Sequence, residues 1–284
     1  MTSTTEPPTG RIPGLSDFTL VERSDGLVTV TFNRPAVKNA LNAENWQDLD
    51  LILTEVTHNP DDRALLITGA GGNFSSGADL SGGLNEDAGE ERTGLTGRRQ
   101  QSTLHEMRNV NLLINRLHRM PKPTIAAVDG VAIGVSLGLA LACDLIVASD
   151  RARFCEIFVK RGLALDGGSS WTLPRNIGVR RAKQMTMLGD MVGAEQALAW
   201  GLVNEVVPVD DLLKVATDMG RRLAAGPTTA LSLIKRLIDD NGALTFEQAL
   251  EEEARAQHIA FTTSDMHEGV LAFVERRQPN FTGA

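Results

Sequence analysis

The sequence contains no tyrosine, and aromatic residues make up only 4% of its 284 residues. The absence of tyrosine removes one common general acid from the candidate catalytic groups. Only two cysteines occur, Cys143 and Cys155, and they form no metal-binding pattern. We therefore predict no metal site and reduced thiols, as in a cytoplasmic protein. A net charge of −8 argues against nucleic acid as a partner, because phosphate neutralisation needs a basic surface.

Long hydrophobic runs are also lacking. The longest, Val131–Cys143, is too short to span a bilayer and is interrupted by glycine and serine, so we predict no membrane association. The N-terminus, MTSTTEPPTGRIPG, has no apolar signal-peptide core, and we interpret residues 1–15 as a flexible arm. The remaining composition, 42% hydrophobic and 23% charged, is that of a globular protein with one large domain or two small ones.

Short apolar segments and helical patterns alternate in the first two thirds of the chain. The apolar patterns predict a hairpin at 18–32 that turns at Ser24–Gly26, and strands at 64–69, 124–130, 144–149 and 152–155. A helix is expected at 43–56, and residues 107–117 predict another that ends before Pro121. The unit of strand, glycine turn and helix occurs twice, at 64–119 and 124–143, which favours an α/β layer architecture.

After Pro174 the pattern becomes mainly helical. Thr245 and Gln248 fit a capping box, which predicts a helix from there to about Phe261. Residues 81–100 are polar and rich in glycine, so we expect a mobile loop that shapes the ligand pocket.

The stretch Gly134–Gly138, GVSLG, fits the G-x-S-x-G pattern of serine hydrolases, with Ser136 as nucleophile. His258 and His267 lie downstream, where the third member of a triad is expected. The pattern is loose, however, and Ser136 also suits a tight helix start as a small residue.

Two glycine turns suggest a different use for the same stretch. FSSGADL (74–80) and GVAIGVSLG (130–138) each follow a buried strand, and each could present backbone N–H groups. Two such groups directed at one point stabilise a developing oxyanion. That oxyanion is a tetrahedral intermediate in a hydrolase and an enolate in an enzyme that acts on a thioester.

Several longer motifs, in order along the chain, resemble the enoyl-CoA hydratase/isomerase (crotonase) family. They are NRPAVKNALNAE (33–44), ITGAGGNFSSGADL (67–80), PKPTIAAVDGVAIGVSLGLALACDLIVAS (121–149), GLALDGGSSWTLPRNIG (162–178) and HEGVLAFVERRQPNFTG (267–283). The resemblance covers residue 16 to the end. It implies an α/β fold with a crotonase-like ββα spiral core at 16–205 and a C-terminal helical trimerisation region at 206–284. It also implies an acyl-CoA substrate, no cofactor beyond the coenzyme A that the substrate carries, and a homotrimer or hexamer.

The resemblance also assigns candidate site residues. The oxyanion amides fall on Ala78, after Ser76-Gly77, and on Val135, after Gly134. The positions that match the walls of the acyl-CoA site are Lys38, Ala40, Ser76, Asp79, Leu80, Gly134, Phe158 and Leu163. Arg276 matches a basic position in the C-terminal tail that approaches the CoA phosphates from a neighbouring subunit. Ser136 would then be a spacer beside the second amide.

The reaction is less clear from the motifs, because the two hydratase glutamate positions match Gly138 and Phe158. Glu156 lies two residues before Phe158, where it could face the same side of an extended segment. Asp166 matches the aspartate of dienoyl-CoA isomerases and of ring-opening 2-(epoxy-dihydrophenyl)acetyl-CoA isomerases. Burial among Phe158, Leu163 and Leu165 would raise its pKa toward the working range. Without the family match, Asp166 would be a turn residue before two glycines.

Four functions therefore stand at this point. The first is a double-bond isomerase of enoyl-CoA thioesters with Asp166 as acid and base. The others are a hydratase with an unrecognised carboxylate, a non-catalytic acyl-CoA binder and a serine hydrolase with Ser136.

Overall fold

The computed structural model describes residues 12–80 and 100–284, without the side chains of residues 100–103. Most of the predicted N-terminal arm and of the predicted loop 81–100 lies outside the described residues. Ile12 is already buried against the core, and Gln100 is the first residue of a helix. Within the described ranges, every helix is too short or too polar to cross a membrane.

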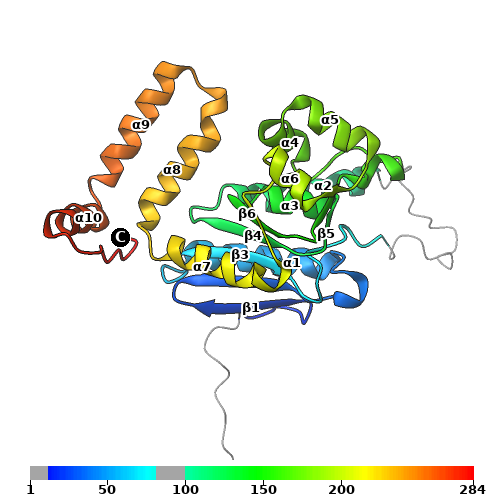
Figure 1. Cartoon of the computed structure of the whole chain (residues 1–284), viewed down its shortest axis with the longest axis horizontal. Coiled ribbons are helices and arrows are strands. Elements are labelled where there is room, and N and C mark those ends of the chain that lie inside the picture. Colours follow the sequence, from blue (N-terminus) through cyan, green and yellow to red (C-terminus); the bar gives the residue numbers. More distant parts are fainter. Residues whose placement is uncertain (1–11, 81–99) are drawn as a thin grey trace, which may run out of the picture.

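A six-stranded sheet with the order β1-β2-β3-β4-β6-β9 forms the centre of the protein (Figure 1). β1 and β2 form the predicted antiparallel hairpin, and the other neighbours pair in parallel. The strands are β1 (Thr19–Ser24), β2 (Leu27–Phe32), β3 (Ala64–Gly69), β4 (Thr124–Val128), β6 (Leu145–Ser149) and β9 (Glu205–Val207). Helices cover both faces of the parallel part, so its strands read as continuous apolar runs, and all five residues of β4 are buried. The predicted α/β class is confirmed.

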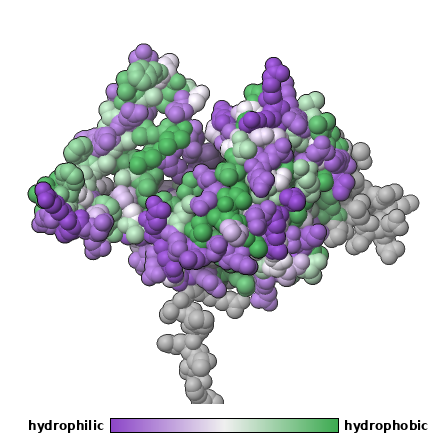
Figure 2. All heavy atoms as spheres, viewed as in Figure 1, coloured by the Kyte–Doolittle hydropathy of each residue, from purple (hydrophilic) through white to green (hydrophobic). Residues whose placement is uncertain are grey.

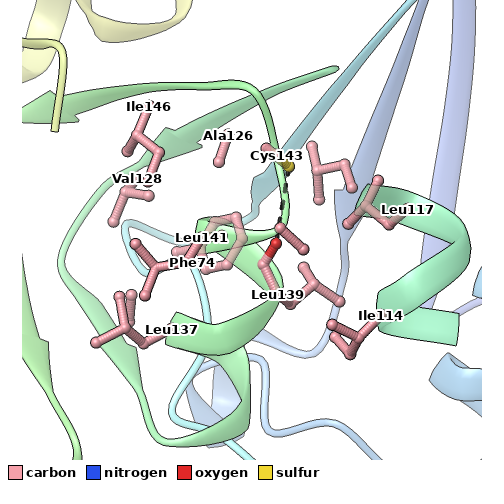
Figure 3. Close-up of a cluster of buried hydrophobic side chains, with 14 of the residues drawn as sticks. Phe74, Ile114, Leu117, Ala126, Val128, Leu137, Leu139, Leu141, Cys143 and Ile146 are labelled. Atoms are coloured by element: carbon pink, nitrogen blue, oxygen red, sulfur yellow. Dashed lines mark hydrogen bonds between the residues drawn. The ribbon is translucent and has the colours of Figure 1, made fainter. Parts of the chain in front are cut away.

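One face of the sheet packs against α1 (Ala43–His58), α2 (Gln100–His118) and α3 (Val135–Leu141). All seven residues of α3 are buried. Figure 3 shows Leu137, Leu139 and Leu141 of α3 between side chains of the sheet and the end of α2. α3 is therefore a fixed element at the centre of the protein, which matters because the second glycine turn leads directly into it.

The opposite face of the sheet is covered by α7 (Leu212–Ala224). Its apolar side chains pack on the residues of β2, β3, β4 and β6 that alternate with those of the first face. A predicted domain boundary at residue 205 falls within β9, and α7 lies on the sheet, so the first part of the predicted C-terminal region packs directly on the core.

A second, three-stranded sheet consists of β5 (Val131–Ile133), β7 (Arg153–Cys155) and β8 (Val192–Gly193). Neither β5 nor β8 is predicted by the sequence pattern, which indicates only a turn between β4 and α3. β5 forms because its three residues pair in parallel with β7, where each partner lies 22 residues downstream. This pairing holds the end of β7 beside the second glycine turn.

Helices beyond β7 build the remaining wall. They are the 3-10 turn η4 (Ile157–Arg161), α4 (Ser169–Ile177), α5 (Val179–Leu188) and α6 (Ala194–Trp200). Pro174 lies inside α4 rather than before the helical part. The helix begins at Ser169, because Gly168 takes the left-handed conformation at its N-cap (φ 78°), and Pro174 costs this short helix only one hydrogen bond.

The last three helices, α8 (Thr228–Asp240), α9 (Phe246–Ala260) and α10 (Ser264–Glu275), project from the body, with α8 and α9 side by side (Figure 1). The predicted capping box is confirmed, since Thr245 Oγ1 accepts from Gln248 N and the Gln248 side chain accepts from Thr245 N. α8 has no buried residue. Figure 2 shows apolar residues on these helices, and the large exposed ones are Ile234, Ile238, Phe246, Leu250, Ile259, Phe261, Val270, Leu271, Phe273 and Val274.

Candidate active site

The two glycine turns lie against each other. Ser75 N donates to Val131 O at 2.9 Å, and Ile133 N donates to Ser75 O at 3.2 Å. A Cβ atom at Gly77 would lie 2.6 Å from Ile133 O, so this position accepts only glycine. Two segments that are more than fifty residues apart in the sequence therefore form one continuous structure.

Each candidate oxyanion amide follows a glycine with positive φ. Gly77 has φ 96° before Ala78, and Gly134 has φ 57° before Val135. The two neighbours of Ala78 are hydrogen-bonded to Leu41. Leu41 N donates to Gly77 O, and the N–H of residue 79 donates to Leu41 O. In such a bridge the N–H of the central residue points away from the partner strand.

Val135 is the first residue of α3, so its N–H has no acceptor within the helix. The preceding amide, Gly134 N, donates to Cys155 O at 2.8 Å. Among the described residues, neither Ala78 N–H nor Val135 N–H has a hydrogen-bond partner. Two amides without a partner among the described residues therefore lie on two joined turns, and their role in an oxyanion hole stays a prediction.

Ser136 connects the two turns internally. Its side chain is fully buried, and Oγ lies 2.8 Å from Ser75 O and 2.9 Å from Ile133 O. Oγ also accepts from Ile133 N at 2.9 Å. A hydroxyl with these backbone partners and no described histidine bonded to it braces the turns and is not arranged as a nucleophile.

The candidate CoA-binding residues come from two adjacent segments. Lys38 and Ala40 follow the 3-10 turn η1 (Pro35–Val37), and Ser76 N donates to Lys38 O at 2.9 Å. The Lys38 side chain is exposed, as the predicted contact with CoA requires. Leu80 is also exposed, at 54%.

Asp79 has a structural partner. Its Oδ2 accepts from Arg34 Nη1 at 2.9 Å, and the same nitrogen donates to Ala40 O. This ion pair ties the η1 segment to the first glycine turn, so Asp79 holds together the two segments that carry candidate CoA-binding residues.

The loop with Asp166 packs directly on α3. A Cβ atom at Gly138 would lie 2.6 Å from Gly167 O, and one at Gly167 would lie 3.5 Å from Val135 Cγ2. Gly167, the residue after Asp166, therefore packs beside Val135, which carries the second candidate amide. The same contact leaves no room for any side chain at Gly138, the match of a hydratase glutamate.

Asp166 begins the turn at Gly167-Gly168 through its backbone, but its side chain takes no part in that turn. Its Oδ1 is buried and has no hydrogen-bond partner among the described residues, although Asp166 O accepts from Ser169 N at 3.2 Å. Burial raises the pKa of Asp166 from its ordinary 3.8 to about 6. Such a carboxylate is ionised at neutral pH and close enough to its pKa to exchange protons readily.

Glu156 is the site residue that the sequence pattern does not assign. It is fully buried, and neither carboxyl oxygen has a hydrogen-bond partner among the described residues. Burial raises the pKa of Glu156 from its ordinary 4.5 to about 8. The Ser169 hydroxyl lies near enough to lower this pKa in part, although the two groups do not meet hydrogen-bond geometry, and the charge of Asp166 raises it further. The only sign of this residue in the sequence is that a glutamate stands between apolar residues.

The expected alternation between Glu156 and Phe158 does not apply, because η4 begins at Ile157. Phe158 is nevertheless buried at the second turn, where a Cβ atom at Gly134 would lie 3.5 Å from its Cζ. Leu163 is 42% exposed and is not part of a closed wall. Arg276 is the C-cap residue of α10 in the projecting region, and its contact with the CoA of a neighbouring subunit stays a prediction.

A cavity of about 690 Å³ lies elsewhere, at the opposite end of α3. Its walls include His118, Trp171, Lys235 and Asp239, and none of the three candidate catalytic residues. It is therefore not the cavity in which an oxyanion at Ala78 and Val135 would form. No group of three or more His, Cys, Asp or Glu suited to a metal ion occurs in the part of the chain that the structure describes.

Residues 22–284 match the family model described as Enoyl-CoA hydratase/isomerase. The chain belongs to this family. The arrangement of two sheets, buried α3 and C-terminal helices is accordingly the crotonase fold, as the sequence motifs predict.

Individual relatives of the chain include both isomerases and hydratases. The 1,2-epoxyphenylacetyl-CoA isomerase of Escherichia coli is 37% identical over 95% of this chain and 100% of its own length. The trans-2-decenoyl-[acyl-carrier-protein] isomerase of Streptococcus mutans is 32% identical over 91% of this chain and 95% of its own. The solved enoyl-CoA hydratase of Bacillus anthracis has a TM-score of 0.85 at 29% identity, and covers 94% of this chain and 100% of its own.

Proposed function

We propose that this member of the enoyl-CoA hydratase/isomerase family shifts a double bond in an enoyl-CoA thioester, with Asp166 as both base and acid. The observation that carries the proposal is the Asp166 carboxyl group. It is buried and unpartnered among the described residues, and its loop packs against the turn that carries the Val135 amide.

The chemistry needs one group that removes a proton and returns it at a second carbon. The Asp166 carboxylate takes the α-proton of a 3-enoyl thioester, and the electrons of that C–H bond move into the thioester to form a dienolate. The oxyanion of the dienolate accepts hydrogen bonds from Ala78 N–H and Val135 N–H. Asp166 then returns the proton at the γ-carbon, which completes the shift and restores the carboxylate.

Hydration is the weaker alternative, because it needs one group that activates water and another that protonates the α-carbon. Phe158 and Gly138, which match the two hydratase glutamates, carry no carboxyl group. At Gly138 the Asp166 loop also leaves no space for a glutamate side chain. The hydrolase alternative is weaker still, because the Ser136 hydroxyl is bonded to backbone groups. A protein that only binds acyl-CoA would not need a buried, unpartnered carboxyl group with a raised pKa at Asp166.

The test is Asp166→Asn, which keeps the size of the side chain and removes the base. The variant is expected to lose exchange of the acyl-CoA α-proton in heavy water by at least about 100-fold, measured by NMR. Binding of the CoA ester, measured by calorimetry, is expected to survive. Unchanged exchange in the variant would refute the assignment, and binding without turnover of any thioester by the wild type would support the non-catalytic binder.

The substrate is proposed to be an acyl-CoA, held by the segments around Lys38 and Ser76. Large apolar side chains are exposed along α8, α9 and α10, and surfaces of this kind mark contacts with other proteins. We propose that other copies of the chain cover them in a trimer or hexamer, which would also bring Arg276 to a neighbouring site.

A further inference from the structure

Buried polar atoms without partners concentrate at one place in the described structure. Such atoms are rare in folded proteins, because each costs free energy unless it is hydrogen-bonded. Four of the five that occur among the described residues belong to Glu156, Asp166 and Ser169: both oxygens of Glu156, Oδ1 of Asp166 and Oγ of Ser169. A polar cluster of this kind needs a shared proton or an enclosed water to be stable.

Three elements bring the cluster together. Glu156 directly follows β7, whose last residue, Cys155, accepts the hydrogen bond from Gly134 N. Asp166 lies in the loop before α4, and Ser169 is the first residue of that helix. Glu156 thus follows the strand that is bonded to the second glycine turn, and Asp166 lies on the loop that contacts α3, close enough for its charge to act on Glu156.

The two carboxyl groups differ in depth. Glu156 has no exposed surface, whereas Asp166 is partly exposed. Two carboxyl groups in one site of low dielectric constant do not ionise together, and the deeper group keeps the proton. Among the described residues no cation forms an ion pair with Glu156, and the titratable groups that face it are Asp166 and the adjacent Cys155.

We propose that Glu156 is a positioning residue for the reaction, which stays protonated near Asp166 so that the single negative charge of the pair resides on the less buried carboxylate, the one that reaches the substrate. This inference rests on the proposed function. In the resting state the pair holds one proton, on Glu156. Transfer of the substrate α-proton to Asp166 makes both groups neutral, and its return to the γ-carbon restores the first state, so the proton of Glu156 is retained throughout.

Ionisation of Glu156 would place a second negative charge beside Asp166 and beside the enolate. We therefore expect Glu156 to set the alkaline limit of activity. The raised pKa values of the two groups agree with this order, because Asp166 ionises at about pH 6 and Glu156 at about pH 8. The rate should rise through the first value and fall above the second.

The experiment compares the wild type with Glu156→Gln, which keeps a neutral side chain of the same shape. The rate of isomerisation of trans-3-hexenoyl-CoA is measured as kcat/KM from pH 5 to 10. The wild type is expected to lose about 10-fold between pH 7 and 9, and the variant less than about 2-fold, with its rate at pH 7 preserved. Asp239→Asn is the control, since Asp239 also has a buried carboxyl oxygen without a hydrogen bond, but lies outside the site beside His118, and the variant should keep the alkaline fall.

Two results would overturn the inference. One is the same alkaline fall in the wild type and in Glu156→Gln. The other is a folded, CoA-binding Glu156→Gln protein without activity at pH 7, since Glu156 would then transfer protons itself.

A second measurement separates this inference from the proposed function. The infrared carbonyl band of a protonated carboxylic acid should be present at pH 7 in the ligand-free wild type, vanish above about pH 8 and be absent from Glu156→Gln. No such difference between the two proteins would refute the protonated Glu156. The band without any isomerisation or α-proton exchange would leave the acid pair standing and refute the isomerase.

Discussion

Replacement of Glu156 by glutamine should change how the stability of the protein depends on pH. The glutamate has its ordinary pKa of 4.5 in the unfolded chain and a pKa of about 8 in the folded one, because burial disfavours its charged form. The folded state therefore binds this proton more tightly than the unfolded state. Its contribution to stability is complete below about pH 4.5 and is lost as the pH rises to about 8.

The size of the effect follows from the difference between the two values. Each tenfold change in proton affinity corresponds to about 1.4 kcal/mol, so the full change is of order 5 kcal/mol. Between pH 5 and pH 8 the wild type should lose about 3 to 4 kcal/mol that Glu156→Gln does not lose. The comparison uses the slope with pH, because an unpartnered glutamine amide costs the variant the same free energy at every pH.

The assay is urea unfolding followed by circular dichroism at several pH values and at one protein concentration, since association also affects stability. The free energy of unfolding of the variant relative to the wild type should rise steadily from pH 5 to 8. The exposed Glu253→Gln is the control and should run parallel to the wild type. Parallel curves for Glu156→Gln as well would refute the argument, because Glu156 would then be solvated or paired in the folded protein.

Two further substitutions test the contacts that shape the site. Gly138→Ala places a Cβ atom 2.6 Å from Gly167 O, so it should destabilise the protein by about 1–3 kcal/mol and lower isomerase activity. Gly242→Ala is the control and should do neither, because the nearest atom to its Cβ would lie 4.0 Å away. Equal melting temperatures of the two variants would contradict the packing at Gly138. Ser136→Ala removes the hydroxyl that braces the two turns and should cost about 1–3 kcal/mol. Covalent labelling of wild-type Ser136 by a fluorophosphonate would show instead that this serine is a nucleophile.

Features that depend on neighbouring residues in the chain were predictable. Apolar runs predict the buried strands β3, β4 and β6, and the capping box at Thr245 predicts the start of α9. Glycine before each candidate amide is also a local requirement, since Gly77 and Gly134 adopt positive φ. The short strand β5 was not predictable, because it exists only through its pairing with β7.

The ordered motifs alone determined the family, the α/β class and the candidate amides at Ala78 and Val135, because these depend on local residue patterns. Only the tertiary structure decided that Ser136 is a brace, that Gly138 has no space for a side chain and that Glu156 is buried near Asp166. Each of these depends on atoms contributed by another segment and on the exclusion of water around them. Burial and close contact arise only when distant segments pack, so no single segment of the sequence contains them.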